Sequence, residues 1–231
     1  MGDIKLLVFD VDGTITDKNR RLCLDCVKAI RIAEKSGVIT VMATGNILPV
    51  ALSLSEFIGS SGPVIAENGG VICYKDDMKK EILGDRSKCE KVLELLEKEG
   101  IKYTRTVTDM CRLSEITLIR DISVERIREV VKKYNIEGVK VVDTHFAIHI
   151  MCSNVSKGVA LRRVLEHLGV PSDNVLYIGD SENDIEAFRL VKHSVALANA
   201  PAFVKKEASY VTSMPYGAGF LEALRHFRII E

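Results

Sequence analysis

Long apolar runs are absent from this sequence of 231 residues. The first one, Ile4–Phe9, is followed by two aspartates, and nowhere do about 18 apolar residues occur together, the length that a bilayer-spanning helix needs. The pattern of a secretory signal peptide is also missing. We therefore expect neither a membrane partner nor export.

Net charge is absent as well, because 32 Lys and Arg residues balance 32 Asp and Glu residues. A neutral chain has no overall field that attracts nucleic acid, although a local basic pocket remains allowed. Proline is scarce at 5 residues, and the hydrophobic and charged fractions are 47% and 28%. This composition excludes a collagenous, coiled-coil or generally disordered chain. We expect a folded protein with no nucleic-acid partner.

Several ligand-binding motifs are also missing. Cys23 and Cys26 form a short pair, but no second pair or His-x-x-x-His follows to complete a zinc site. Neither a Walker glycine-lysine loop nor a G-x-G-x-x-G turn is present, so ATP and dinucleotide binding are not indicated. We expect the six cysteines to be free thiols. Without a secretory signal, free thiols indicate a reducing, cytoplasmic location.

The two ends of the chain alternate between apolar, β-branched runs and helical patterns. Such alternation predicts right-handed βαβ units in a Rossmann-like parallel sheet that is buried on both faces. We predict strands at Ile4–Phe9, Val38–Ala43, Val64–Ala66, Val175–Ile178, Ser194–Leu197 and Tyr210–Val211. Helices are predicted at Cys23–Ser36, Leu48–Ile58, Val155–Leu168, Glu182–Leu190 and Gly217–Phe227, with a short Pro201-led helix between the last two strands.

The middle of the chain shows a helix–strand–strand pattern twice. A helix from about Ser87 precedes strands at Lys102–Val107 and Glu115–Arg120, and a helix at Val124–Tyr134 precedes strands at Val139–Asp143 and Ala147–Cys152. Short connections between strands favour antiparallel pairing. The sequence therefore predicts an α/β core formed by residues 1–80 and 154–231, with an inserted α+β domain of αββαββ pattern at residues 81–153.

Polar residues follow several predicted strands or begin a helix, and ligands of open parallel sheets bind at the carboxyl ends of the strands. There are four such groups: Asp10-Val11-Asp12-Gly13-Thr14, Ala43-Thr44-Gly45-Asn46, Ser156-Lys157-Gly158 and Gly179-Asp180-Ser181-Glu182-Asn183-Asp184. Carboxylates are the ligands that Mg²⁺ prefers, while Lys, Thr and backbone amides suit phosphoryl oxygens. Together they predict a hard-cation site that faces a phosphate.

Each group also has a purely structural interpretation. Asp10 and Asp12 are compatible with ordinary turn acids, and Thr44 with a cap of the following helix. Lys157 alone resembles a solvated surface lysine, and Asp184 has the spacing of a capping box with the serine three residues before it. Four complementary groups at one edge of one sheet favour the ligand site over these separate interpretations.

In content and order the four groups resemble the motifs of the haloacid dehalogenase superfamily of phosphotransferases. Asp10-Val11-Asp12-Gly13-Thr14 is similar to the first motif, Thr44 to the second, Lys157 to the third, and Gly179-Asp180 with Asn183-Asp184 to the fourth. The insert lies between the second and third motifs. Its repeated helix–strand–strand pattern resembles the α+β cap of the Cof-type branch, class IIB.

Within that branch, the short cap and Ala43-Thr44-Gly45-Asn46 are similar to the archaeal-type phosphoglycolate phosphatases. Many Cof-type sugar phosphatases carry Arg where this chain has Asn46. The resemblance thus implies a Mg²⁺-dependent phosphatase, with 2-phosphoglycolate as the first candidate substrate. A sugar-phosphate phosphatase and a phosphomannomutase-like phosphotransferase are the alternatives. A receiver-type signalling domain would be about half as long and would lack the insert.

The resemblance also implies a role for each motif residue. Asp10 is the nucleophile that forms an aspartyl-phosphate, and Asp12 is the general acid and base. Metal ligands are Asp10, the backbone carbonyl of Asp12, Asp180 and, directly or through water, Asp184. Substrate-binding residues are Thr44, Gly45, Lys157 and Asn183, the last contacting either Lys157 or the phosphate.

The cap is expected to close over the site and to select the substrate, a small phosphorylated metabolite. His145 and His149 share one face of a predicted cap strand, and Arg112 or Arg120 is expected to reach a carboxylate such as that of glycolate. A solvated sheet face is the alternative for each of these four. The sequence allows a homodimer but contains no readable interface.

Overall fold

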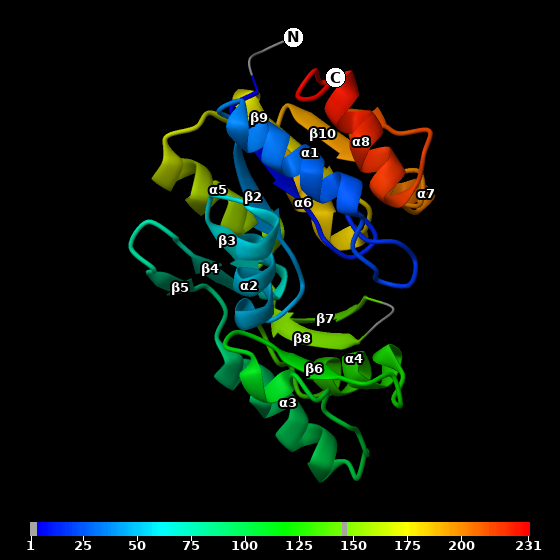
Figure 1. Cartoon of the computed structure of the whole chain (residues 1–231). Coiled ribbons are helices and arrows are strands. Elements are labelled where there is room, and N and C mark those ends of the chain that lie inside the picture. The colour runs from blue at the N-terminus through cyan, green and yellow to red at the C-terminus, as the bar shows by residue number, and fades with distance from the viewer. Residues whose placement is uncertain (1–3, 145–146) are drawn as a thin grey trace. The chain divides into compact units, whose positions relative to one another are not determined.

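The computed structural model describes residues 4–144 and 147–231. The chain divides into two compact units, one formed by residues up to Lys80 together with those from Ser156 onward, and the other by Glu81–Val155. The larger unit is therefore built from two separate parts of the sequence, blue to cyan and yellow to red in Figure 1. The smaller unit is inserted between them in the sequence.

Among the described residues, a sheet of eight strands has the order β11-β10-β9-β1-β2-β3-β4-β5. Seven of the strands belong to the larger unit, and β5 begins at Lys80, where the first part of that unit ends. Neighbours from β11 to β3 pair in parallel, and β4 is antiparallel to β3. Every residue of β1 and β9 is buried, as expected for the centre of a parallel sheet. The strands are β1 (Leu6–Phe9), β2 (Ile39–Ala43), β3 (Val64–Ala66), β4 (Val71–Cys73), β5 (Lys80–Ile82), β9 (Val175–Gly179), β10 (His193–Ala196) and β11 (Tyr210–Val211).

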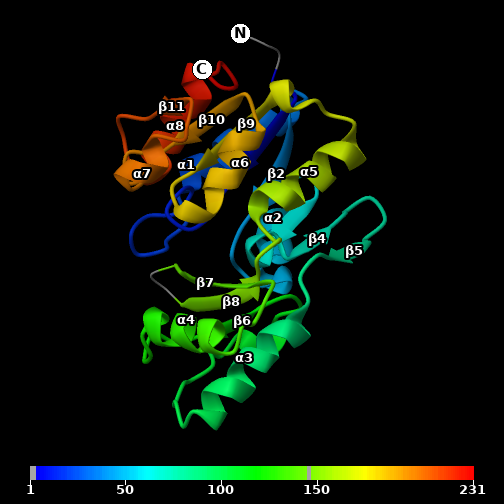
Figure 2. The same ribbon diagram turned by 180° about the vertical axis from the view of Figure 1, so that it is seen from behind.

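Helices cover both faces of this sheet. Helices α1 and α8 lie on the face seen in Figure 1, and α5 and α6 lie on the opposite face, seen in Figure 2. The helices are α1 (Leu24–Lys35), α2 (Leu48–Ile58), α5 (Lys157–Leu168), α6 (Ile185–Leu190), α7 (Ala202–Lys205) and α8 (Tyr216–His226). None of the helices in the described part of the chain is both long and apolar enough to cross a bilayer. The arrangement confirms the predicted α/β class with a parallel sheet.

Local sequence signals locate most of these elements. Predicted and observed bounds agree for α2, β3 and β11, and the other core elements differ by one or a few residues at their ends. The helix predicted from Glu182 is divided, because a 3-10 turn over Glu182–Asp184 precedes α6. The pattern predicted neither β4 nor β5, since three residues each are too few to show a periodicity.

The interpretation of Thr44 as a helix cap is wrong. The residue before α2 is Ile47, and no side chain caps this helix end. The Oγ1 atom of Thr44 instead accepts a hydrogen bond from the backbone N–H of Asn46 over 3.1 Å. The side chain of Thr44 therefore stabilises the loop that follows β2 and not the helix.

The smaller unit has a three-stranded antiparallel sheet of order β6-β8-β7 in its described residues, together with two long helices. Apolar side chains of the helices and strands form its own hydrophobic core, which includes Leu93, Ile116, Ile127 and Ile150. The helices are α3 (Arg86–Lys98) and α4 (Val124–Lys133), and the strands are β6 (Ile116–Leu118), β7 (Val139–Asp143) and β8 (Ile148–Cys152).

The strand predicted at Lys102–Val107 is wrong. This segment makes only an isolated bridge between Arg105 and Leu118. Beyond the bridge, the N–H of Thr117 donates to the carboxylate of Asp109 over 2.7 Å and not to the carbonyl of Thr106. That carbonyl accepts from the N–H of Asp109 in a turn. The carboxylate of Asp109 thus accepts from the N–H group that the next pair of strand hydrogen bonds would need, and the strand pairing ends there.

Candidate active site

The centre of the large sheet brings three of the four motif groups together. Strands β9, β1 and β2 are neighbours, and they run parallel. Asp10 follows β1, Thr44 follows β2, and Asp180 follows β9. The carboxyl ends of parallel strands meet at one edge of the sheet, so these polar side chains converge although they are far apart in the sequence.

Lys157, the first residue of α5, joins the first and fourth motifs. Its Nζ donates to Oδ1 of Asp10 over 2.6 Å and to Oδ1 of Asp184 over 2.7 Å. The lysine side chain is 0% exposed, so its interpretation as a solvated surface residue is wrong. Ser156 caps this helix by accepting from the N–H of Val159, which fixes the position of the lysine.

Asp184 is held on both carboxylate oxygens. Its Oδ1 accepts from Lys157 and from the hydroxyl of Tyr177, at 2.7 and 2.8 Å. Its Oδ2 accepts from the backbone N–H groups of Asp180 and Ser181, at 3.1 and 3.0 Å. Ser181 and Asp184 form the capping box that their spacing predicts. The carboxylate of Asp184 thus caps the 3-10 turn over Glu182–Asp184 and also positions the buried Lys157.

Asp180 is held by residues from two other loops. Its Oδ1 accepts from the hydroxyl of Thr14 over 3.1 Å, and its Oδ2 accepts from Nδ2 of Asn199 over 2.9 Å. Asn199 also donates to the carbonyl of Gly13. A Cβ on Gly13 would lie 2.4 Å from Oδ2 of Asp180, so only glycine permits this close approach.

Asp12 has a different set of partners. Its Oδ1 accepts from Nε of Arg20 over 2.7 Å, and its Oδ2 accepts from Nδ2 of Asn46 over 2.8 Å. Asn46 also donates to Oγ1 of Thr44 over 2.9 Å. The side chain of Asp12 is 20% exposed, in contrast to Asp10 at 6%. Asp12 therefore lies at the accessible side of the cluster.

Asn183 contacts a residue that the sequence motifs did not include. Its Nδ2 donates to Oδ1 of Asn68 over 2.9 Å, and its own Oδ1 accepts from the hydroxyl of Ser181. Asn68 also lies beside Gly45, where a Cβ would come within 2.8 Å of Asn68 Oδ1. In the described part of the chain Asn183 makes no hydrogen bond to Lys157, which was one of its two expected contacts. Asn68 instead joins the second motif to the fourth.

Burial and neighbouring carboxylates raise two pKa values in the site. Burial, together with the charges of Asp184 and Asp180, raises the pKa of Asp10 well above its usual range, although Lys157 opposes the shift. Burial and the charge of Asp184 raise the pKa of Asp180 to about 7. Burial alone would lower the pKa of Lys157, but Asp10 and Asp184 outweigh it and raise that pKa. Lys157 donates to two of the three carboxylates, Asp10 and Asp184, so the cluster has more acidic groups than cations.

This donor set fits a divalent cation. Asp10, Asp180 and Asp184 each offer a carboxylate oxygen, and these atoms lie within 4.8 Å of one another. Hard oxygen donors of this kind suit Mg²⁺, and a cation would offset the repulsion that raises the pKa values of Asp10 and Asp180. The residues present therefore agree with the expected metal site.

The candidate specificity residues of the smaller unit are already engaged in ion pairs. Arg112 contacts the carboxylate of Glu115, which is also 3.1 Å from Nδ1 of His149. Arg120 pairs with Asp143 over 2.9 Å. The fourth candidate, His145, lies outside the described residues.

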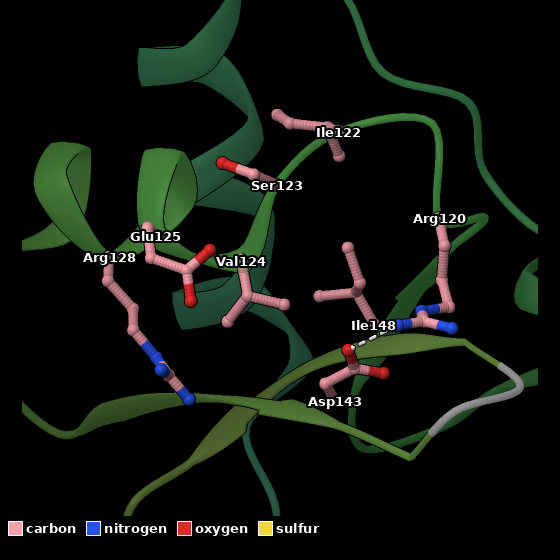
Figure 3. Close-up of a pocket in the computed structure, with 8 residues that line it drawn as sticks. All are labelled: Arg120, Ile122, Ser123, Val124, Glu125, Arg128, Asp143 and Ile148. Atoms are coloured by element: carbon pink, nitrogen blue, oxygen red, sulfur yellow. Dashed lines mark hydrogen bonds and ion pairs between the residues drawn. The ribbon is translucent and has the colours of Figure 1, made fainter.

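A cavity of about 370 Å³ in the smaller unit lies beside the pair of Arg120 and Asp143. Figure 3 shows this pair joined by a dashed line, with Val124 and Ile148 between it and Arg128. Arg128 donates to the backbone carbonyl of Val141. The cavity has a mixed apolar and charged lining and none of the four motif groups, so the strand-end cluster remains the better candidate site.

Sequence reasoning missed four residues that hold the motif side chains in place: Arg20, Asn68, Tyr177 and Asn199. One signal was available for Asn68, because an Asn-Gly-Gly turn directly after a strand has the composition of a functional loop. Tyr177 reads as an ordinary core residue of β9. Its hydroxyl partner becomes apparent only when the loop carrying Asp184 is placed.

Comparison with known proteins defines the class. The model of the haloacid dehalogenase-like hydrolases matches residues 7–116 and 113–224. The chain therefore belongs to this family, which confirms the resemblance of its motifs. Among solved structures, a protein of Thermoplasma acidophilum superposes with a TM-score of 0.90 at 28% identity, covering 99% of this chain and 100% of the other. A subclass IIB sugar phosphatase shares the fold, with a TM-score of 0.79 at 21% identity and coverage of 98% and 100%.

Curated relatives indicate a particular activity within this family. A phosphoglycolate phosphatase of Methanothermobacter thermautotrophicus is 45% identical over 226 residues, which cover 97% of this chain and 99% of the relative. A phosphoglycolate phosphatase of Archaeoglobus fulgidus is 40% identical over 228 residues, covering 98% of each chain. The similarity therefore spans both units of the chain.

Proposed function

We propose that this protein is a Mg²⁺-dependent phosphatase that hydrolyses 2-phosphoglycolate to glycolate and phosphate through an aspartyl-phosphate on Asp10. The contact between Lys157 and Asp10 supports this proposal most directly, because a buried ammonium group 2.6 Å from a carboxylate both orients a nucleophile and offsets the charge of an incoming phosphate. The relatives named phosphoglycolate phosphatases support the choice of substrate. Six free thiols support a cytoplasmic location.

In the first step Asp10 attacks phosphorus, and the bond from phosphorus to the ester oxygen breaks. Asp12 donates a proton to the leaving alkoxide, which departs as an alcohol. In the second step Asp12 accepts a proton from a water molecule that attacks the phosphorus, which frees Asp10 and releases phosphate. A positioned acid and base of this kind contributes roughly 10²–10⁴-fold to the rate.

The remaining motif residues position the phosphoryl group. The hydroxyl of Thr44 and the N–H of Gly45 follow β2, at a loop where anionic oxygens are favourably bound, and Asn183 and Lys157 contribute further donors. Asp10, Asp180, Asp184 and the backbone carbonyl of Asp12 would hold the Mg²⁺ ion. When bound, the cation supplies positive charge that reduces the repulsion between the nucleophile and the phosphate dianion.

The test is phosphate release in the presence of Mg²⁺ from 2-phosphoglycolate, several hexose and pentose phosphates, and p-nitrophenyl phosphate. We expect the highest kcat/KM for 2-phosphoglycolate. A higher kcat/KM for a hexose phosphate would show that the enzyme is a phosphatase whose substrate is a sugar phosphate. Release from no substrate, with turnover only when a bisphosphate activator is added, would favour a mutase and overturn the proposal.

A further inference from the structure

Arg20 occupies an unusual position in a hairpin between β1 and α1, the dark-blue loop before α1 in Figure 1. The hairpin is closed by a bridge between Thr16 and Leu22. Within it, Oδ1 of Asp17 accepts from the N–H groups of Asn19 and Arg21, at 2.8 and 2.9 Å. These contacts define the turn without the side chain of Arg20.

The backbone of Arg20 has a φ of 62°. This left-handed conformation suits glycine or asparagine and is unfavourable for a longer side chain. An arginine at such a position points to a function for its side chain, since the turn itself would form more easily without it.

The Arg20 side chain is directed at the proposed acid and base. Its Nε lies 2.7 Å from Oδ1 of Asp12, and its Nη2 lies 3.5 Å from Oδ1 of Asn46. Asn46 holds the second oxygen of Asp12, so the orientation of this carboxylate is determined from both sides. The side chain of Arg20 is 49% exposed, which leaves a large part of it accessible to a ligand.

We propose that Arg20 binds a carboxylate on the leaving group and thereby selects 2-phosphoglycolate; this inference rests on the proposed function. Asp12 must contact the ester oxygen in order to protonate it. In 2-phosphoglycolate a single methylene separates that oxygen from the carboxylate carbon. A cation in direct contact with Asp12 is therefore placed beside the substrate's carboxylate, and the planar guanidinium matches its geometry.

Arg20 is better placed for this role than Arg112 of the smaller unit. It belongs to the same compact unit as Asp10, so its position relative to the nucleophile is determined by the fold of that unit. Arg112, in contrast, has a side chain only 7% exposed and contacts Glu115, a carboxylate of its own unit. Recognition of the leaving group thus begins in the catalytic unit.

The test compares 2-phosphoglycolate with 2-hydroxyethyl phosphate, which replaces the carboxylate with an uncharged hydroxymethyl group. We expect Arg20→Gln to lower the preference for 2-phosphoglycolate, the ratio of the two kcat/KM values, about 10- to 100-fold, the worth of one charge-assisted hydrogen-bonded contact. Most of the change should be in KM for 2-phosphoglycolate. Arg20→Lys should retain part of the preference, and Arg21→Gln, which removes the neighbouring exposed charge, should retain all of it.

The outcomes separate the two proposals. A wild-type protein with no preference between the esters would contradict the choice of 2-phosphoglycolate, whatever the variants do. A preference that survives Arg20→Gln, or an equal loss for both esters, would overturn the role of Arg20 as a carboxylate ligand, the second result showing that it only positions Asp12. Calorimetric binding of 3-phosphonopropionate and propylphosphonate gives the same comparison without turnover, and thermal unfolding checks that each variant is folded.

Discussion

Nζ of Lys157 donates to Oδ1 of Asp10 over 2.6 Å, with the two side chains 0% and 6% exposed. The same ammonium group also donates to Asp184, whose side chain is 0% exposed. Two carboxylates from opposite ends of the chain thus share one buried cation. The same buried ion pairs therefore hold the site residues in place and contribute to the stability of the larger unit.

Replacing Lys157 with Met should destabilise the protein strongly. Asp10 and Asp184 would lose their shared cation, and removal of one partner of a buried ion pair costs about 3–5 kcal/mol. At roughly 2–4 °C per kcal/mol for a chain of this size, the melting temperature should fall by roughly 10 °C. Thermal unfolding in EDTA measures this change in melting temperature. Lys28→Met is the control, because Lys28 is 75% exposed and its removal should change the melting temperature little.

A double variant tests whether the cost arises from the carboxylate. Asp10→Asn combined with Lys157→Met should be more stable than the sum of the single changes predicts, because Asp10→Asn removes the carboxylate charge that Lys157→Met leaves without its cation. Strict additivity of the two changes in unfolding free energy would show that the ion pair is not the source of the effect.

Asp10→Asn alone should abolish turnover while preserving the fold. The amide has the size of the carboxylate but is not a nucleophile, so kcat should fall by several orders of magnitude. Phosphate release and circular dichroism measure the two properties. As a control, Asp25→Asn makes the same change at a carboxylate that is 68% exposed and lies outside the four motif groups, and it should keep turnover. Retained activity in Asp10→Asn would contradict the assignment of the nucleophile.

The metal-free protein should lose stability as the pH rises. The pKa of Asp180 is about 7 in the folded protein, against about 4 for an unfolded aspartate. Between these values the folded state binds a proton that the unfolded state does not, so raising the pH favours unfolding. Melting temperatures in EDTA should therefore decline from pH 5 to about pH 7.

Asp180→Asn removes this titrating group and should make the decline smaller, while Asp10, whose pKa burial also raises, remains in place. Mg²⁺ should raise the melting temperature of the wild type more at pH 8 than at pH 5, because its carboxylate ligands are then ionised and binding stabilises the folded state. The same decline in Asp180→Asn as in the wild type would mean that another group is responsible.

Gly69 and Gly37 form a matched pair for testing the loop after β3. Both have positive φ, 95° and 85°, so an alanine is strained at either position by about 1–2 kcal/mol. A Cβ at Gly69 would lie 2.1 Å from the carbonyl oxygen of Ser156, whereas nothing lies within 4 Å at Gly37. Gly69→Ala should therefore displace the start of α5, with a larger fall in melting temperature and a loss of phosphatase activity that Gly37→Ala does not show. Equal effects of the two substitutions would contradict this close packing.

Much of this protein could be read from its sequence. Apolar runs that end in Asp10, Thr44 and Asp180 predict parallel strands with polar residues at one edge, because a strand buried on both faces must be apolar until it leaves the sheet. The order of the motifs identified the family, which the comparisons confirm. Local signals were weaker in the inserted unit, where Asp109 takes a backbone donor and prevents the strand predicted at Lys102–Val107.

Only the tertiary structure decided which side chains meet. Lys157 and Asp10 are 147 positions apart, Asn183 and Asn68 are 115 apart, and Asn199 and Asp180 come from separate loops. The sequence by itself determined the residue types at the strand ends, because those follow from local periodicity. Their contacts depend on the strand order and on how α5 packs against the sheet, and no local pattern encodes either of these.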